Sequence, residues 1–201
     1  MRLLPVLAAA TVLLAGCSAG TSAEGQQGPA VSRPSPDVAA GAVIAGVQTF
    51  PYVAPDHQAR DFDYLQSPPV GGDHWPPSAG GVTGWLTCGT FDAQVPDEFA
   101  VHSMEHGAVW LTYRPGEDAA GLAALAALQP DYVLVSPYAG QSGAYGASTW
   151  GAQLFVDSPE DPRLEQFVRA YAGGPQGREQ GAPCTGGSTP EQARAALKAA
   201  G

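Results

Sequence analysis

All four histidines of this 201-residue chain, His57, His74, His102 and His106, lie within one quarter of its length. Imidazole is the commonest metal ligand among protein side chains and the usual proton carrier near neutral pH. The clustering of every imidazole therefore predicts a site. We interpret it as a transition-metal site built from separate segments, with these four side chains as ligands. A set of imidazole donors suits zinc or copper.

The residues around the histidines indicate how the ligands would be held. His74 follows Pro68–Asp73, a segment rich in proline and glycine. Such a loop loses little entropy on ordering and lets the backbone approach a site closely. Carboxylates beside metal-bound imidazoles commonly accept the second ring N–H and fix the orientation of the ring. We therefore expect Asp73 and Glu105 to support the ligands rather than to bind the ion.

The segment from His102 to His106 also spells H-x-x-E-H, a pattern found in zinc hydrolases. On a helix over residues 97–106, the two histidines lie one turn apart and can share an ion, with Glu105 beside them as a general base. On a strand over residues 101–113, the two imidazoles are roughly 13 Å apart and Glu105 faces away from them. The local conformation therefore decides whether hydrolysis is chemically feasible.

Three functions are compatible with these residues. The first is the binding or handling of copper or zinc. The second is zinc-dependent hydrolysis, which requires a third protein ligand such as Glu165 or Glu179. The third is a cell-envelope scaffold in which the histidines are structural and the exposed aromatics Trp75, Trp85 and Tyr145 contact a partner. Because a five-residue pattern is weak without its structural context, we favour a non-enzymatic role.

The amino terminus has the pattern of a bacterial lipoprotein. Residues 1–16 combine Arg2 with an apolar run too short to span a bilayer, which is typical of a signal peptide. The run ends in Leu14-Ala15-Gly16-Cys17, which is similar to a lipobox, where the cysteine is lipidated and becomes the first residue after cleavage. Residues 17–40 are small and polar, as expected of a flexible tether. We therefore expect a lipid anchor on Cys17 at the outer face of the cytoplasmic membrane.

The remaining cysteines predict a disulfide. Three cysteines are present, and assigning Cys17 to the lipid leaves Cys88 and Cys184 as an even pair. Thiols of exported proteins tend to pair. A bridge between these two would close a loop of about 100 residues, and it would tie the histidine-rich half of the chain to the C-terminal tail.

Charge and length limit the class of protein. The chain has 19 acidic and 9 basic residues and a net charge of −10, which argues against nucleic-acid partners and against electrostatic binding to anionic lipid. Residues 41–188 are enough for a single globular domain with a sizeable core. A C-terminal helix over residues 189–201 is predicted by the capping-box pattern that begins at Thr189. This helix is rich in alanine and has few large apolar side chains to bury, so we expect it to be a surface appendage.

The order of elements predicts an α+β fold. The N-terminal half, to about residue 96, is rich in proline and glycine and should form loops with short strands, one of them over residues 85–91. In the second half of the chain, hydrophobic periodicity predicts regular strands and helices. Strands are expected over residues 108–113, 132–136 and 147–156, and helices from Glu117 and from Ser158. Short connections favour a mainly antiparallel sheet with the two helices packed on one face.

Several short motifs are distributed along the chain from Tyr64 to Cys184. They are Tyr64, Pro68-Pro69-Val70-Gly71-Gly72-Asp73-His74, Cys88-Gly89, Val101 to Tyr113 including His-Ser-Met-Glu-His-Gly, Ser148-Thr149-Trp150-Gly151 and Ala182-Pro183-Cys184. Together they resemble domain-of-unknown-function family 3105, over about residues 42 to 187. The pairing of Pro-Pro-x-Gly-Gly-x-His with His-Ser-x-Glu-His-Gly is the specific part of the resemblance.

The resemblance implies an exported or membrane-attached bacterial protein, often a lipoprotein, without an established reaction. The four histidines, Glu105 and the Cys88 and Cys184 pair match the family pattern, and Met104 stands where leucine is usual. Met104 is therefore expected in the core rather than on a metal. Phe91 replaces a tyrosine, and extra residues at 77–84 lengthen the link between two motifs. Genes of the family often lie beside those of another exported, metal-handling family in actinobacteria, so the resemblance also implies copper and a metal-handling envelope partner by association.

Overall fold

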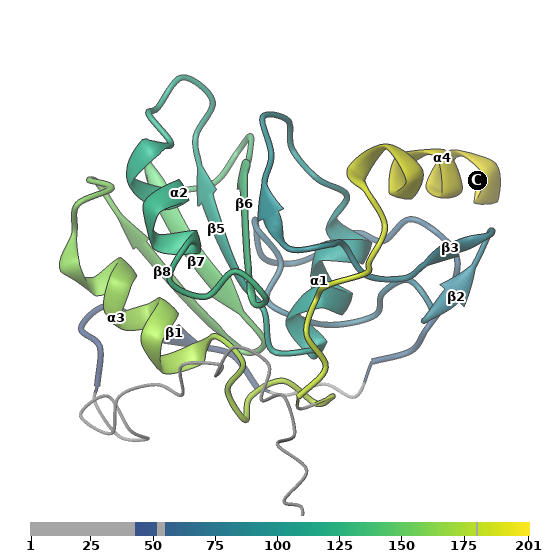
Figure 1. The fold of residues 1–201 in the computed structure, drawn as a ribbon, viewed down its shortest axis with the longest axis horizontal. Helices are drawn as coiled ribbons and strands as arrows, with labels where there is room; N and C mark the ends of the chain where they lie inside the picture. The colour runs from purple at the N-terminus through teal and green to yellow at the C-terminus, as the bar shows by residue number, and fades with distance from the viewer. Residues whose placement is uncertain (1–42, 52–54, 180) are drawn as a thin grey trace, which may run out of the picture. The chain divides into compact units, whose positions relative to one another are not determined.

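A six-stranded mixed sheet is the centre of the domain (Figure 1). The computed structural model describes residues 43–51, 55–179 and 181–201, so the expected signal peptide, Cys17 and the tether lie outside the described residues. The strand order is β1-β8-β7-β5-β6-β4. The strands are β1 (Gln48–Thr49), β4 (Gly89–Thr90), β5 (Val109–Tyr113), β6 (Val133–Pro137), β7 (Tyr145–Thr149) and β8 (Ala152–Val156).

Two kinds of pairing meet at β5, the central strand. β5 runs parallel to β6 and antiparallel to β7, and β7 pairs antiparallel with β8. The edge strand β4 is parallel to β6, and β1 is antiparallel to β8. Helices accompany the sheet, so the expected α+β class is confirmed, with a sheet that is mixed rather than purely antiparallel.

The two predicted helices pack on one face of the sheet. They are α2 (Ala120–Ala126) and α3 (Pro162–Tyr171), which lie beside each other in Figure 1. α2 contacts β6 and β4, and α3 contacts β7 and β8. Leu122, Leu164 and Phe167 from these helices are fully buried in one core cluster with Val109 and Leu111 of β5. The cap of α3 is Asp161, with proline next in the chain, rather than Ser158. The helix therefore begins one short turn later than predicted.

The opposite face of the sheet is covered by α1 (Asp97–Glu105) and the loops of the N-terminal half. Because side chains alternate along a strand, Trp110 and Leu134 project to this face and join a second core cluster. Phe99 and Met104 of α1 are fully buried in the same cluster. The expected core position of Met104 is thus confirmed, and α1 is fixed against the sheet.

The strand predicted over residues 147–156 is wrong. This segment is the hairpin of β7 and β8, with Trp150 and Gly151 between the strands. Gly151 has a φ of 73°, a left-handed conformation that glycine adopts without strain. The alternation of apolar residues continues across the turn, which is why periodicity alone merged the two strands.

The N-terminal half is rich in loops, as predicted, but its strands are shorter than expected. The strand over residues 85–91 is reduced to the two residues of β4. The extra residues at 77–84 form a second, two-stranded sheet of β2 (Ser78–Ala79) and β3 (Val82–Thr83). The Gly84 N–H donates to the Pro77 carbonyl at 3.0 Å. This hydrogen bond joins the two ends of the insertion.

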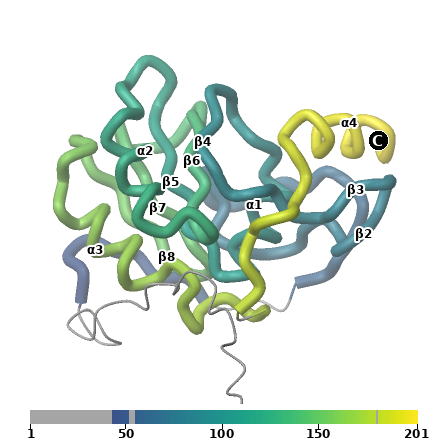
Figure 2. Tube along the Cα trace, viewed as in Figure 1, coloured from purple at the N-terminus to yellow at the C-terminus, as the bar shows by residue number. Residues whose placement is uncertain are grey.

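The C-terminal helix α4 (Pro190–Ala200) begins with the predicted capping box at Thr189. It is more than a surface appendage, since Ala193 and Ala196 are buried in the second core cluster. The small side chains let the helix pack close to the β2–β3 turn, where Gly80 faces Ala196. The segment before α4, yellow in Figure 2, is held through a backbone bridge between Leu86 and Ser188.

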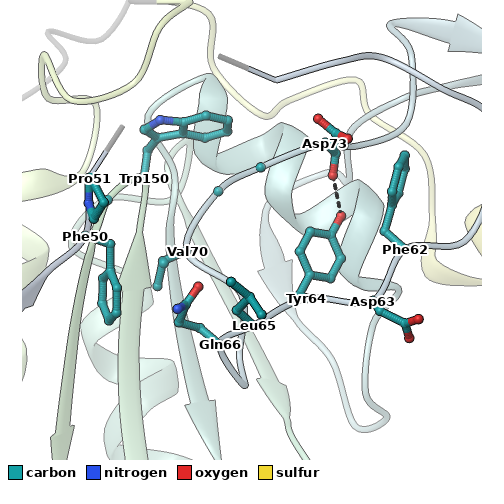
Figure 3. Close-up of a pocket in the computed structure, with 13 residues that line it drawn as sticks. Phe50, Pro51, Phe62, Asp63, Tyr64, Leu65, Gln66, Val70, Asp73 and Trp150 are labelled. Carbon is teal, nitrogen blue, oxygen red and sulfur yellow. Dashed lines mark hydrogen bonds between the residues drawn. The ribbon is translucent and has the colours of Figure 1, made fainter. Parts of the chain in front are cut away.

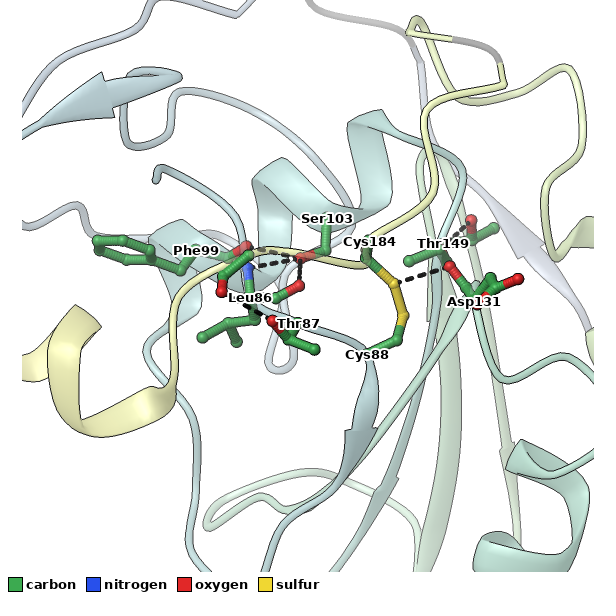
Figure 4. The surroundings of a disulfide bond; sticks show 10 residues. Leu86, Thr87, Cys88, Phe99, Ser103, Asp131, Thr149 and Cys184 are labelled. Atoms are coloured by element: carbon green, nitrogen blue, oxygen red, sulfur yellow. Dashed lines mark hydrogen bonds between the residues drawn. A yellow bond between two sulfur atoms is a disulfide. The ribbon is translucent and has the colours of Figure 1, made fainter. Parts of the chain in front are cut away.

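A disulfide joins Cys88 to Cys184, as predicted (Figure 4). It links the start of β4 to the C-terminal segment across 96 positions of sequence. Beside it, the Cys184 N–H donates to the Asp131 carbonyl at 3.0 Å, and the Cys88 N–H donates to the Cys184 carbonyl at 3.3 Å. Among the described residues, no helix is both long and apolar enough to cross a membrane.

Candidate metal centre

The H-x-x-E-H segment is helical. α1 begins at Asp97, where acidic residues in the first turn suit the helix dipole, and ends before Gly107, whose φ is 98°. His102 lies in its last turn and His106 is its C-terminal cap, so the two imidazoles are one turn apart, with ring centroids separated by 5.0 Å. The alternative of a strand through these residues is therefore wrong.

His57 and His74 come from two loop segments that run side by side. The His74 N–H donates to the Asp56 carbonyl and the Gln58 N–H donates to the His74 carbonyl, both at 3.1 Å. This parallel bridge brings the two imidazole centroids to 4.5 Å. Asp73 supports the pairing, because its Oδ1 accepts the Asp56 N–H at 2.7 Å. Asp73 thus supports the site through the backbone next to His57, and this hydrogen bond does not involve an imidazole.

Three histidines and one carboxylate converge where these segments meet α1. Oε2 of Glu105 lies 3.0 Å from Nε2 of His74 and 3.3 Å from Nε2 of His57. The His102 ring centroid is 4.8 Å from that of His74. One ligand atom from each of the four residues lies within 4.8 Å of every other. Glu105 therefore belongs to the group of potential ligands, and not only to their support as expected.

Backbone carbonyls determine which nitrogen of each buried imidazole faces the group. Nδ1 of His74 donates to the Gly72 carbonyl at 2.8 Å, and Nδ1 of His102 donates to the Trp75 carbonyl at 2.7 Å. With Nδ1 taken by a carbonyl, each ring turns Nε2 towards the site: Nε2 of His74 faces Oε2 of Glu105, and on a neutral His102 ring Nε2 carries a lone pair. A carbonyl that accepts the second ring N–H is the usual support of a metal-bound histidine.

The electrostatic state of the group suits a cation. Burial and, to a smaller extent, the neighbouring His74 lower the pKa of His102 to about 3, so this imidazole is neutral at neutral pH. For Glu105, burial raises the pKa, but the hydrogen bonds from His74 and His57 and the charge interactions with His74 and His102 outweigh it and leave a lowered pKa. The site thus places a neutral nitrogen donor, His102, beside an anionic oxygen donor, Glu105, which is the protonation state that metal binding requires of these two ligands.

His106 lies in a second, adjoining group. Its Nε2 is 3.0 Å from Oε2 of Glu179, and His102, His106 and Glu179 also offer ligand atoms within 4.8 Å of one another. Burial lowers the pKa of His106, although Glu179 opposes the shift. The other carboxylate considered as a third ligand, Glu165, instead pairs with Arg169 at 2.6 Å. The four histidines therefore form two overlapping groups rather than one four-imidazole site.

Two features of the site have no signal in the sequence. The carbonyls of Gly72 and Trp75 are backbone atoms, which any residue type supplies. The role of Gly84 is equally hidden, because it depends on packing: a Cβ there would lie 2.0 Å from the Pro76 oxygen and 2.8 Å from Nδ1 of His102. Gly84 has an ordinary φ, so the requirement for glycine is steric.

This packing gives a first prediction. Gly84→Ala should lower the free energy of unfolding by about 3 kcal/mol, because the methyl group forces the Pro76 carbonyl or the His102 ring to move. Chemical denaturation would measure the loss. Gly116→Ala is the control, since a Cβ at Gly116 meets nothing within 4 Å and only its φ of 100° is strained. An equal loss in the two variants would contradict the steric argument.

The aromatics expected to form an exposed contact surface are largely buried. Trp75 is 1% exposed and stacks on Phe99, and Tyr145 is 4% exposed within β7. Trp85 is half-buried and packs its ring on His102 and His106, with centroid distances of 5.6 and 4.8 Å. The exposed aromatic surface that the scaffold hypothesis required is therefore absent at these three residues, because their side chains pack in the core or against the imidazoles of the site.

A cavity of about 270 Å³ adjoins the loop that carries His74 (Figure 3). Its walls include the aromatic rings of Phe50, Phe62 and Tyr64, and the Tyr64 hydroxyl donates to the Asp73 carbonyl at 2.7 Å. Trp150 also lines it and makes an edge contact with His74, with centroids 5.9 Å apart. The same aromatic side chain therefore contacts both the cavity and a potential ligand.

The fold and the site together define an α+β domain with a buried cluster of histidines and carboxylates that could hold a metal ion. Residues 57–186 match the family described as "Protein of unknown function (DUF3105)", and the chain belongs to this family. The resemblance read from the motifs is thus confirmed. Neither a curated protein nor a solved structure matches the chain.

Proposed function

We propose that the domain binds one transition-metal ion, zinc or copper, through Nε2 of His57, His74 and His102, with Glu105 as the fourth ligand. All four ligand atoms lie within 4.8 Å of one another, and three imidazoles with one carboxylate match the donors that zinc and copper(II) accept. Ligand bonds of about 2.0–2.2 Å to a central ion require only small side-chain movements from these positions.

One observation supports metal binding over a purely structural role. His102 is fully buried, yet its Nε2 has no hydrogen-bond partner among the described residues. An unsatisfied buried polar atom costs about 1–3 kcal/mol. A structural role for the cluster would leave that cost unexplained, whereas a bound cation satisfies the lone pair. His57, with 34% of its side chain exposed, gives the ion a route to solvent.

The test is a titration of the recombinant domain with Zn²⁺ and with Cu²⁺. Wild-type protein should bind one equivalent, and His74→Asn should bind at least about 100-fold more weakly, because a ligand is lost rather than its support. Met104→Leu is the control, a substitution of similar volume on the same helix that should leave affinity unchanged. Wild-type protein that binds neither ion would refute the proposal.

Zinc-dependent hydrolysis is a second candidate, favoured by the helix through His102 and His106 and by Glu179 as a third ligand. In this arrangement Glu105 is the general base. The carboxylate is nevertheless already engaged by the imidazoles of His57 and His74, so a ligand role suits it better than proton transfer. If the protein hydrolyses an ester or peptide, Glu105→Gln should abolish the activity; a variant with full activity would rule the mechanism out.

We further propose that the domain lies outside the cytoplasm, tethered by lipid on Cys17 to the outer face of the cytoplasmic membrane. The lipobox-like Leu14-Ala15-Gly16-Cys17 and the Cys88–Cys184 disulfide support this placement. A metal-handling protein of the envelope is then the expected partner. The net charge of −10 makes nucleic acid an unsuitable one.

If Cys17 is lipidated, its substitution should remove both the acyl chains and the attachment to the membrane. In a bacterial host, the full chain should incorporate labelled palmitate and partition into detergent, and Cys17→Ala should do neither, because the thiol that carries the acyl chains is gone. Cys88→Ala should still be labelled, which separates lipidation from disulfide formation. Membrane fractionation with labelling makes the measurement. Retention of the label in Cys17→Ala would contradict the proposed anchor.

A further inference from the structure

The four imidazoles form a continuous row through the domain. Successive ring centroids are separated by 4.5 Å from His57 to His74, by 4.8 Å from His74 to His102 and by 5.0 Å from His102 to His106. The row ends at Glu179, on Nε2 of His106. The two ends reach solvent, since the side chains of His57 and Glu179 are 34% and 48% exposed, while the three central imidazoles are buried.

His102 belongs to both groups of potential ligands, yet it has one free nitrogen. Its Nδ1 donates to the Trp75 carbonyl, so only Nε2 can bind an ion. A single lone pair binds one ion at a time. An ion with its full set of ligands at His57, His74, His102 and Glu105 therefore excludes a fully bound ion at His102, His106 and Glu179.

Backbone contacts position the second group as well as the first. The Glu179 N–H donates to the Glu105 carbonyl at 3.0 Å, which attaches the segment carrying this carboxylate to the end of α1. Gly177 makes the close approach possible, because a Cβ there would lie 2.6 Å from the backbone nitrogen of Gly107. The position of Glu179 against His106 thus results from a specific close packing of two backbones.

Two nitrogens of the second group are buried without a hydrogen-bond partner among the described residues. They are Nδ1 of His106 and Nε2 of His102. The ring of Trp85 covers both imidazoles. Two nitrogens and one carboxylate oxygen give three protein ligands, one fewer than the first group. A tetrahedral ion would keep one open coordination position there.

We propose that the domain has two overlapping metal positions, and that a divalent ion passes between them by exchange of ligands around His102. The inference rests on the proposed metal-binding function. The four-ligand position retains the ion, and the three-ligand position at Glu179 exchanges it with a partner or chelator. A carboxylate in each group favours a divalent ion, zinc or copper(II), over copper(I), which prefers soft sulfur ligands. No bond other than metal–ligand bonds forms or breaks.

The first arm of the test removes the retaining position and keeps the other. A His57→Asn, His74→Asn double variant should still bind one equivalent of Co²⁺ or Zn²⁺, about 100-fold more weakly than wild type. Adding Glu179→Gln to the double variant should abolish the remaining binding. Cobalt(II) absorption in the visible range reports the ligand set directly. The spectrum of the double variant should therefore differ from that of the wild type.

The second arm measures exchange in a protein with both imidazole segments intact. Transfer of Zn²⁺ from the protein to a chromophoric chelator should be about tenfold slower in Glu179→Gln than in wild type. It should also be slower in Gly177→Ala, whose methyl group pushes the segment of Glu179 away from the backbone of residues 105–107 without replacing a ligand side chain. Glu165→Gln is the matched control, a glutamate of the same half of the chain that pairs with Arg169 and should leave the rate unchanged.

The outcomes separate the two proposals. Wild-type protein that binds no metal overturns both. Wild-type protein that binds one equivalent, together with a folded double variant that binds none, overturns the second position alone. Two equivalents bound by wild type with both ligand sets complete would overturn mutual exclusion at His102. If the double variant does not fold, an unchanged transfer rate in Glu179→Gln would still overturn the exchange route.

Discussion

His102→Gln should abolish high-affinity metal binding, with a larger effect than loss of any other single histidine. His102 is the one residue shared by the two ligand groups, so its substitution leaves neither position complete. We expect the dissociation constant for Zn²⁺ to rise by more than about 100-fold, beyond the cost of losing a supporting residue. Neutral glutamine keeps a polar group near the Trp75 carbonyl, which limits the change in packing.

The same variant gives a second readout through thermal stability. At a free metal concentration of about 1,000 times the dissociation constant, binding adds about 4.1 kcal/mol to the free energy of unfolding. For a domain of this size, this corresponds to a rise in Tm of about 8–16 °C. Zn²⁺ should produce the rise in wild type and in Met104→Leu, but not in His102→Gln. An equal rise in all three proteins would show that the ion binds elsewhere.

Removing the disulfide should cause the largest loss of stability. The Cys88→Ser, Cys184→Ser double variant frees a loop whose ends are 96 positions apart. Loop-closure entropy puts the loss near 4.7 kcal/mol, equivalent to a fall in Tm of about 10–20 °C. The double substitution avoids leaving a reactive single thiol, and circular dichroism during heating measures the result.

Two comparisons make the disulfide prediction specific. Wild-type protein in reducing agent should approach the Tm of the double variant, since both lack the bridge. The Zn²⁺ affinity of the double variant should fall less than that of His102→Gln, because α1 and the loop of His74 are held by the core and not by the bridge. A loss below about 1 kcal/mol would mean that the unfolded chain is already constrained without the bridge.

The elements with regular periodicity could be predicted from the sequence, because their burial depends on residue type and spacing alone. Apolar residues at helical spacing gave α3, with Leu164, Phe167 and Val168 all buried as the pattern requires. The capping box at Thr189 gave the start of α4. Failures occurred where periodicity was ambiguous: the same alternation continues through the turn at Gly151, and a strand pattern near Cys88 forms only two paired residues.

The conformation around His102 was the decisive ambiguity. Both a helix and a strand place His102 and His106 on one face, since four residues are close to one helical turn and to two full strand repeats. The structure resolves it as a helix because Phe99 and Met104 are buried together against the sheet. Tertiary packing, not local propensity, therefore selects the conformation on which the chemistry depends.

By itself, the sequence determined which residue types are available: the imidazoles, the acidic residues beside them, the paired cysteines and the family to which they belong. It also predicted the α+β class. The grouping of the ligands was decided only by the fold. Hydrogen bonds to the Trp75 and Gly72 carbonyls orient the rings, and the contact of Gly177 with α1 delivers Glu179 from 73 residues beyond His106. The distances between the ligand atoms depend on backbone contacts between remote segments, and the spacing of residues along the chain does not determine these contacts.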